Sequence, residues 1–173
     1  YNYSSNENGL IFYEDKNGVI KLPTPNVKGQ FQLENISTAI ATLRSINHLK
    51  VSEKHIKDGI TKIKSIARLQ EIESGNLKEL VKKNKLLVDG SHNPLGAKVL
   101  NEYLESLNCN KHIILGMMSN KDHNDYMSYF KNISSLTTID IPNQPNSIKG
   151  KVLKNKLNSF ENVRYKESII DAI

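Results

Sequence analysis

The sequence predicts an α/β protein with a mostly parallel sheet and flanking helices in its C-terminal part. Two observations lead to this prediction. From about residue 85 onward, short apolar runs alternate with amphipathic segments of helical length, which is the pattern of βαβ units. Before residue 65 the pattern is instead a hairpin followed by two helices. We therefore expect two domains, residues 1–64 and residues 65–173.

The first domain opens with a predicted β-hairpin. Residues 9–13 and 18–22 are short apolar runs, and Asn17-Gly18 between them is a strong turn signal. Two prolines soon after residue 22 end the second strand, because proline cannot donate a hydrogen bond to a strand ladder.

Two amphipathic helices follow the hairpin. Apolar residues recur at helical spacing from Gln30 to about Leu49, and Ser52 is a suitable N-cap for the second helix. The apolar faces consist of Ile36, Ala39, Ile40, Leu43 and Ile46 in the first helix and of Ile56, Ile60 and Ile63 in the second. In this chain alone we expect the stripe of the first helix to be exposed and to promote association.

The second domain alternates strands and helices in a Rossmann-like order. After a strand-like stretch over residues 65–74, strands are predicted at about 86–89, 112–117, 136–141 and 162–165, and helices at about 94–107, 122–132 and 148–159. The chain opens on Tyr1 without an initiator Met and ends in mid-pattern at Ile173. We therefore expect it to be a fragment of a longer protein.

The most informative stretch is residues 86–94, Leu-Leu-Val-Asp-Gly-Ser-His-Asn-Pro. Its three apolar residues are too few for a helix and suit a strand covered on both faces. Asn93 is a good N-cap, and Pro94 suits the first helical position. Asp89 and His92 are thus expected in the crevice beyond the carboxyl end of a parallel strand, where open α/β sheets bind ligands.

This loop also has a plainer interpretation, in which Asp89 and Asn93 only cap local structure and His92 is solvated. A Ser-His-Asp triad is excluded, because neighbouring loop residues cannot fold back into a nucleophile, base and orienting acid.

The helix after the loop carries an apolar stripe that is expected to be buried, consisting of Leu95, Val99, Leu100, Tyr103, Leu104 and Leu107.

Composition narrows the class of partner. The formal net charge of the 173 residues is +6, but the lysines are spread along the chain, which favours small anionic molecules over nucleic acid.

The longest apolar run, Ile113 to Met118, is too short to span a membrane. The single cysteine, Cys109, excludes an intramolecular disulfide and a cysteine-based zinc site. A reducing cytoplasm is the expected location.

Three separated segments form a recognisable pattern, namely Gly29–Asn35, Ala67–Gln70, and Asp89–Pro94 followed by Leu115–Met118 and Lys121-Asp122. In this order and spacing they resemble the C-terminal part of folylpolyglutamate synthase/dihydrofolate synthase, in the Mur ligase superfamily. The resemblance runs from about residue 22 to the end of the chain. The matching residues are Gln32, Asn35, Arg68, Asp89 and His92. The departures are Phe31, Ile36, Ser65 and Ala67, where the family usually has His, Ala, Trp and Gly.

The resemblance implies that residues 1–64 are the end of a Mur-ligase-type central ATP-binding domain and residues 65–173 a C-terminal domain. It implies an ATP-dependent ligase that joins L-glutamate to dihydropteroate or folate through an acyl phosphate. Arg68 would reach phosphate oxygens, since its planar fork pairs two of them. Gln32 and Asn35 would bind the adenine edge, and Asp89 and His92 the ribose or phosphates. Arg68 and His92 are the expected catalytic residues.

Each of these roles has an alternative. Arg68 can instead form a surface salt bridge, and Gln32 and Asn35 can cap their helix. Lys121 can face an anion, whereas Asp122 is expected to cap the next helix. The remaining histidines are expected to be ordinary surface or interface residues, namely His48, His55, His112 and His123.

The cofactors implied are ATP and magnesium. The family's Gly-Lys-Ser phosphate loop does not occur in these residues, so that loop and the magnesium ligands are expected before Tyr1, and this fragment alone is expected to be inactive. The full-length protein is expected to be a monomer. Two alternatives remain open: another Mur-type ligase acting on peptidoglycan precursors, and a non-catalytic nucleotide-binding α/β module.

Overall fold

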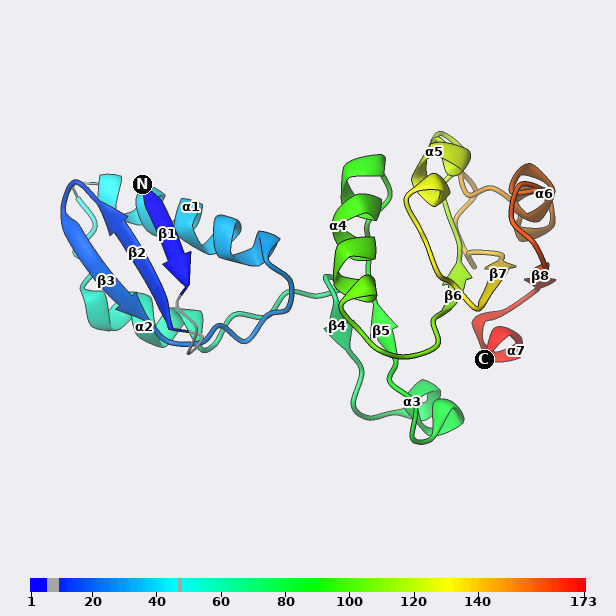
Figure 1. Ribbon diagram of the computed structural model, residues 1–173, viewed down its shortest axis with the longest axis horizontal. Coiled ribbons are helices and arrows are strands. Elements are labelled where there is room, and N and C mark those ends of the chain that lie inside the picture. Colours follow the sequence, from blue (N-terminus) through cyan, green and yellow to red (C-terminus); the bar gives the residue numbers. More distant parts are fainter. Residues whose placement is uncertain (6–9, 47) are drawn as a thin grey trace. The chain divides into compact units, whose positions relative to one another are not determined.

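The computed structural model describes residues 1–5, 10–46 and 48–173 (Figure 1). The chain divides into two compact units, residues 1–70 and residues 71–173, each with its own hydrophobic core. Gly9, at the predicted start of the hairpin, lies outside the described residues. Within the described residues, none of the helices is long and apolar enough to cross a membrane.

The first unit contains a small antiparallel sheet and two helices. Its elements are β1 (Asn2–Ser5), β2 (Ile11–Asp15), β3 (Gly18–Leu22), α1 (Phe31–Ser45) and α2 (Glu53–Ile60). The predicted hairpin is confirmed, because β2 pairs with β3 and Asp15 lies opposite Gly18 across the turn. Gly18 has a φ of 103°, which favours glycine. Strand β1 was not predicted, since it is mostly polar.

The helices pack their isoleucines against this sheet. Ile36 and Ile40 of α1 and Ile56 of α2 are each at most 6% exposed, in one core with Tyr13 and Leu22. Burying one such side chain stabilises the fold by about 1.5–3 kcal/mol. The expectation that the stripe of α1 is exposed in this chain is therefore wrong for Ile36 and Ile40, because the hairpin sheet already covers them.

The helix boundaries follow local signals. Ser52 caps α2 as predicted: its hydroxyl accepts the His55 N–H, while the Ser52 N–H donates to His55 Nδ1, both at 3.3 Å. Helix α1 ends at Ser45 rather than near Leu49, because Ile46 already has extended backbone angles.

The second unit is built on a parallel sheet of β6 (His112–Leu115), β7 (Ser135–Ile139) and β8 (Val163–Lys166), in that order. Its helices are α3 (Asn76–Val81), α4 (Pro94–Glu105), α5 (His123–Ser128), α6 (Gly150–Lys156) and α7 (Ile169–Ala172). The core includes Leu115, Met127, Leu136, Leu153 and Leu157. The predicted class, a parallel sheet flanked by helices, is confirmed.

One predicted strand of this sheet lies elsewhere. Strand β5 (Leu87–Val88) pairs with β4 (Gln70–Glu71) in a separate two-stranded sheet, and the Ile72 N–H donates to the Leu86 carbonyl at 2.9 Å. Val88 is 37% exposed, so the prediction of a strand covered on both faces is wrong. The predicted stretch over residues 65–74 forms a strand only at β4. An apolar run predicts a strand but not which neighbour it pairs with.

Helix α4 begins as predicted, with Pro94 in its first turn and Asn93 Oδ1 accepting the Gly96 N–H at 2.8 Å. The predicted apolar stripe is confirmed for Leu100 and Leu104, which pack against the core, and is wrong for Leu95, which is 72% exposed. Ala97 and Asn101 are the buried residues of this helix. Asn101 belongs to the core side because its Oδ1 accepts the Lys131 N–H at 3.0 Å, a partner that apolar periodicity does not reveal.

Candidate functional site

The loop after β5 is ordered by its own side chains. Asp89 Oδ1 accepts the Ser91 N–H at 2.8 Å, which is an Asx-turn. His92 is exposed, and its Nδ1 lies 3.2 Å from the Gly90 carbonyl oxygen. A proton on Nδ1 donates to that carbonyl and leaves Nε2 as the acceptor of the neutral ring. The loop thus holds a carboxylate and an imidazole three positions apart.

A residue that the sequence did not indicate supports this loop. Tyr126 of α5 is 4% exposed, and its hydroxyl lies 3.0 Å from Ser91 Oγ. Burial raises the pKa of the Tyr126 hydroxyl, and the nearby Asp89 charge raises it further, although the bond to Ser91 lowers it. No sequence pattern links residues 35 positions apart, so only the fold shows this pair.

Arg68 lies on a tight turn of the first unit. Its neighbours Ala67 and Leu69 have φ values of 51° and 47°. Leu69 is buried and the Ala67 N–H donates to Gln70 Oε1 at 3.0 Å, which fixes the turn. Arg68 is exposed, and its Nη1 donates to the Ala67 carbonyl at 2.9 Å. Among the described residues it forms no salt bridge, so that alternative is not realised here.

Gln32 and Asn35 lie together at the start of α1, as their spacing predicted. Asn35 Nδ2 donates to Gln32 Oε1 at 3.1 Å, and Gln32 Nε2 lies 3.5 Å from Ser65 Oγ. Gln32 is 7% exposed, whereas Asn35 is exposed. Gln30 occupies the N-cap position, and no side chain caps the helix there. The capping alternative for Gln32 and Asn35 is therefore wrong.

A groove of about 410 Å³ lies beside these amides, between α1 and α2. It is lined by Val27, Gln32, Asn35, Ile36, Ala39, Ile40, Leu43, His55, Ile56, Gly59, Ile60 and Ile63. This volume exceeds the ~150 Å³ that holds a benzene ring. An apolar lining with a few polar groups is typical of small-molecule sites, because apolar walls give affinity and the polar groups give orientation.

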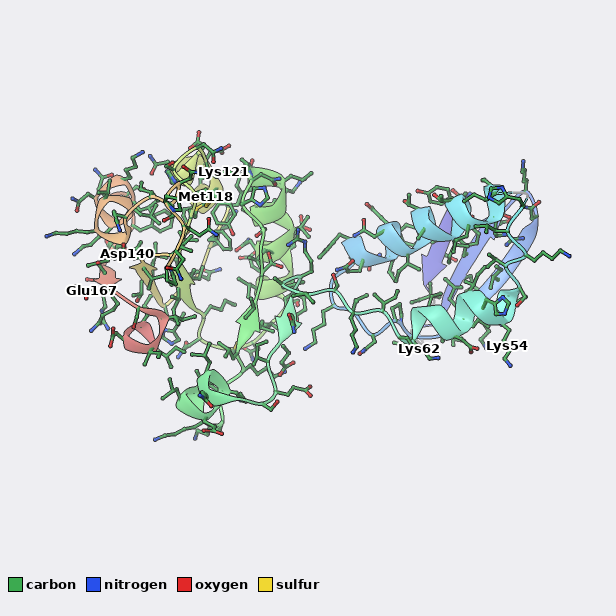
Figure 2. All side chains as sticks on the ribbon, turned by 180° about the vertical axis from the view of Figure 1, so that it is seen from behind. Lys54, Lys62, Met118, Lys121, Asp140 and Glu167 are labelled. Atoms are coloured by element: carbon green, nitrogen blue, oxygen red, sulfur yellow. The ribbon has the colours of Figure 1, made fainter. Side chains whose placement is uncertain are left out.

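The carboxyl ends of the parallel strands carry other polar residues. Figure 2 labels two of them, Lys121 after β6 and Asp140 after β7. Asp140 links the end of β7 to α6 and β8. Its Oδ1 accepts the Gly150 N–H at 2.6 Å, and the Tyr165 hydroxyl donates to its Oδ2 at 3.3 Å. Lys121 is half-buried, and its orientation toward an anion remains a prediction.

Two predictions for the segment after β6 have different outcomes. Asp122 caps α5 as predicted, since its Oδ1 accepts the Asp125 N–H at 2.9 Å. His123 was expected to be an ordinary surface or interface residue, but it is 3% exposed and its Nε2 lies 3.0 Å from the Met118 carbonyl oxygen. The surface alternative is wrong, because the ring is buried and the carbonyl supplies its partner.

The site residues thus form two groups. Gln32, Asn35 and Arg68 belong to the first unit, and Asp89 and His92 to the second. Nowhere in the described part of the chain do three or more His, Cys, Asp or Glu side chains gather in a way that holds a metal ion.

The parallel sheet and its flanking helices place the second unit among Rossmann-like α/β domains, with the fold of the C-terminal domain of FolC. The resemblance to folylpolyglutamate synthase/dihydrofolate synthase is confirmed by solved structures of that enzyme, to which nearly the whole chain is similar.

E. coli FolC in complex with ADP is 27% identical, with a TM-score of 0.78 over 99% of this chain. Folylpolyglutamate synthase of Mycobacterium tuberculosis, complexed with ADP and AMPPCP, is 17% identical with a TM-score of 0.81, also over 99%. The bifunctional enzyme of Yersinia pestis, complexed with AMPPNP and a Mn ion, is 22% identical with a TM-score of 0.76 over 98%.

The chain spans 38% of the length of each of these structures. The Mycobacterium tuberculosis and Yersinia pestis structures share less than 25% of their residues with this chain, so their similarity shows the fold alone. No protein-family model matches the sequence, and no curated protein matches it.

Proposed function

We propose that this chain is part of an ATP-dependent ligase that joins L-glutamate to dihydropteroate, folate or both. The observation that carries the proposal is the agreement of fold with ADP-bound E. coli FolC over 99% of the chain, at 27% identity. Because the chain spans 38% of that structure, its residues would supply one part of a larger site.

The reaction consists of two group transfers. A carboxylate oxygen of the pterin substrate attacks the γ-phosphorus of ATP, ADP leaves, and an acyl phosphate forms. The amine of glutamate then attacks the acyl carbon, inorganic phosphate leaves, and the amine gives up a proton as the amide forms. The first transition state places negative charge on phosphate oxygens, and the second places it on the acyl oxygen and the departing phosphate, so fixed cations lower both barriers.

Arg68 is the proposed cation. Its guanidinium is exposed, uses one N–H on its own turn, and has further donors in a planar fork that matches two phosphate oxygens. The buried Leu69 anchors the turn, so the base of the arginine is held while its end is accessible. Preorganised charge of this kind needs little rearrangement during the reaction.

The amides of α1 are the proposed adenine contact. Asn35 has an acceptor and a donor on one exposed side chain, and its bond to the buried Gln32 fixes its orientation. An adenine edge presents the complementary pair of an amino donor and a ring nitrogen acceptor. The neighbouring apolar groove would contact a flat ring.

The loop of the second unit is the proposed contact to the ribose or phosphates. The Asp89 carboxylate accepts hydrogen bonds from hydroxyl groups, and the His92 imidazole donates to a phosphate oxygen when its accessible nitrogen is protonated. The Ser91 N–H bond to Asp89 fixes the direction of the carboxylate. Magnesium and pterin contacts are proposed to come from residues beyond this chain.

A product assay tests this function. A polypeptide that extends this chain to the length of its structural neighbours would be incubated with ATP, magnesium, L-glutamate and either dihydropteroate or folate. We expect ADP release that depends on glutamate and a pterin product heavier by one glutamyl unit in mass spectrometry. Turnover with a peptidoglycan precursor instead, or no turnover with any acceptor, would contradict the proposal.

A further inference from the structure

The loop that carries Asp89 and His92 is fixed from outside by a buried tyrosine. Ser91 Oγ lies 3.0 Å from the Tyr126 hydroxyl. The Tyr126 ring is 4% exposed and packs on Phe130, with 5.4 Å between ring centroids. A buried phenol hydroxyl needs a hydrogen-bond partner, and Ser91 supplies it.

The first turn of α4 also packs on Ser91. A Cβ atom on Gly96 would lie 2.8 Å from Ser91 Cβ and 3.3 Å from Asn93 Oδ1, so a larger residue at position 96 would displace the loop. Helices α4 and α5 pack against each other, as their neighbouring positions in Figure 1 show. Ser91 is therefore held through its hydroxyl by α5 and through its Cβ by α4.

Ser91 lies between the two residues proposed to contact the nucleotide. Its backbone N–H also fixes Asp89 Oδ1, and His92 is the next residue in the chain. A rotation of Ser91 would therefore move both the carboxylate and the imidazole. Tyr126 is buried, so it does not reach a ligand itself, and its hydroxyl acts on the loop through the contact with Ser91.

We propose that Tyr126 is a positioning residue, which fixes the Asp89–His92 loop for nucleotide binding through its hydrogen bond to Ser91 Oγ. The consequence for catalysis rests on the proposed ligase function, whereas the ordering of the loop does not. Preorganisation of this kind improves binding, because less conformational freedom is lost when the ligand arrives.

Hydrogen exchange of this 173-residue chain tests the contact without any enzyme activity. Tyr126→Phe removes the hydroxyl and keeps the ring, and Ser91→Ala removes its partner. We expect either change to speed exchange of the Ser91 amide about tenfold, and the double variant to add nothing further. Tyr129→Phe, the same change three residues later, is the matched control and should leave the Ser91 amide unchanged. Unaltered exchange in Tyr126→Phe would overturn the proposal.

Kinetics of the extended polypeptide test the consequence. We expect Tyr126→Phe to raise the KM for ATP about tenfold with little change in kcat, since loop order chiefly affects binding. A lower unfolding temperature with unchanged KM would show a merely structural role and overturn the proposal. Faster exchange in a polypeptide that has no ligase turnover would support the positioning contact and contradict only the ligase function.

Discussion

The turn around Arg68 places two residues other than glycine in the left-handed backbone region. Ala67 has a φ of 51° and Leu69 a φ of 47°, although a side chain makes this region unfavourable by roughly 1–2 kcal/mol per residue. The burial of Leu69 and the bond from the Ala67 N–H to Gln70 hold the turn in place. Ala67 is also the position where the resembling family usually has glycine, and its φ gives a physical reason for that preference.

Ala67→Gly should therefore leave stability unchanged or raise it by up to about 1 kcal/mol, because relief of the unfavourable φ offsets the greater freedom of glycine in the unfolded chain. Ala39→Gly, on the exposed side of α1, is the control and should cost about 1 kcal/mol. Urea unfolding measures both. Equal losses at the two positions would contradict the assigned backbone conformation.

Gly150 begins α6 where the backbone passes close to β7. A Cβ atom there would lie 2.7 Å from the carbonyl carbon of Ile139 and 2.8 Å from Tyr165 Cε2. Gly150→Ala should destabilise the second unit by about 1–3 kcal/mol through overpacking. Gly59→Ala, inside α2 with nothing within 4 Å of the new Cβ, should stabilise by about 0.5–1 kcal/mol. Thermal unfolding would contradict this account if Gly150→Ala were also neutral or stabilising.

The hairpin of β2 and β3 and helix α1 are joined by a charged cluster. Tyr13 donates to Asp15 Oδ2 at 2.8 Å, and Arg44 Nε lies 3.4 Å from the same oxygen. Burial alone would raise the pKa of Asp15, but bonds from the Asn17 N–H and Tyr13, together with the Arg44 charge, hold this pKa below its ordinary value of 3.8. Burial and the bond to Asp15 raise the pKa of Tyr13 to about 12.

These shifts give the first unit a dependence on pH. The folded-state pKa of Asp15 is depressed, so its contribution to stability is present above the ordinary pKa of 3.8 and is lost as the pH falls through the folded value. Urea unfolding should therefore show lower stability below about pH 4. Asp15→Asn should weaken that dependence, whereas Asp58→Asn, an exposed control on α2, should not. An unchanged pH dependence in Asp15→Asn would contradict the cluster's role.

The loop of the second unit should affect nucleotide binding more than folding. Asp89→Ala and His92→Ala in the extended polypeptide should each weaken ATP binding about tenfold, as loss of a hydrogen bond to a charged group does. Both residues lie in a loop, so neither change opens a core cavity, and the unfolding temperature should change little. Calorimetric titration and thermal unfolding measure the two effects. A large drop in unfolding temperature with unaltered ATP binding would identify the loop as a structural cap.

Elements with local signals were predictable from the sequence. Ser52, Asn93 and Asp122 cap their helices as expected, because a cap depends on residues within one turn. The partner of β5 was not predictable, because strand β4 lies in a separate stretch of the chain and only the fold brings the two together. The burial of His123 was not predictable either, because its contact with the Met118 carbonyl depends on how the loop after β6 folds.

For the site, sequence spacing predicted that Gln32 and Asn35 share a helix face, and the structure joins them by a hydrogen bond. The same reasoning did not find Tyr126, since its contact with Ser91 exists only after α4 and α5 have packed. The sequence thus predicted a contact between residues on one helix face, but not a contact that depends on the packing of two helices.

Each unit has its own core, and each carries residues that we propose to contact a nucleotide. The lysines are spread over both units: Figure 2 labels Lys54 and Lys62 in the first and Lys121 in the second. A spread of lysines provides a general attraction for anions, whereas the planar guanidinium of Arg68 provides the directed contact to phosphate.

We propose that Arg68 supplies a phosphate-binding cation to a folate–glutamate ligase, and turnover of the extended polypeptide with Arg68 substituted tests this role. Arg68→Ala should lower kcat for glutamate-dependent ADP release by about 10²–10³-fold, the usual effect of removing one charge-stabilising group from a transition state. Arg68→Lys should restore only part of that loss, because a point charge cannot pair two oxygens. The unfolding temperature should be unchanged, since Arg68 is exposed. Near wild-type turnover in a folded Arg68→Ala variant would contradict the account.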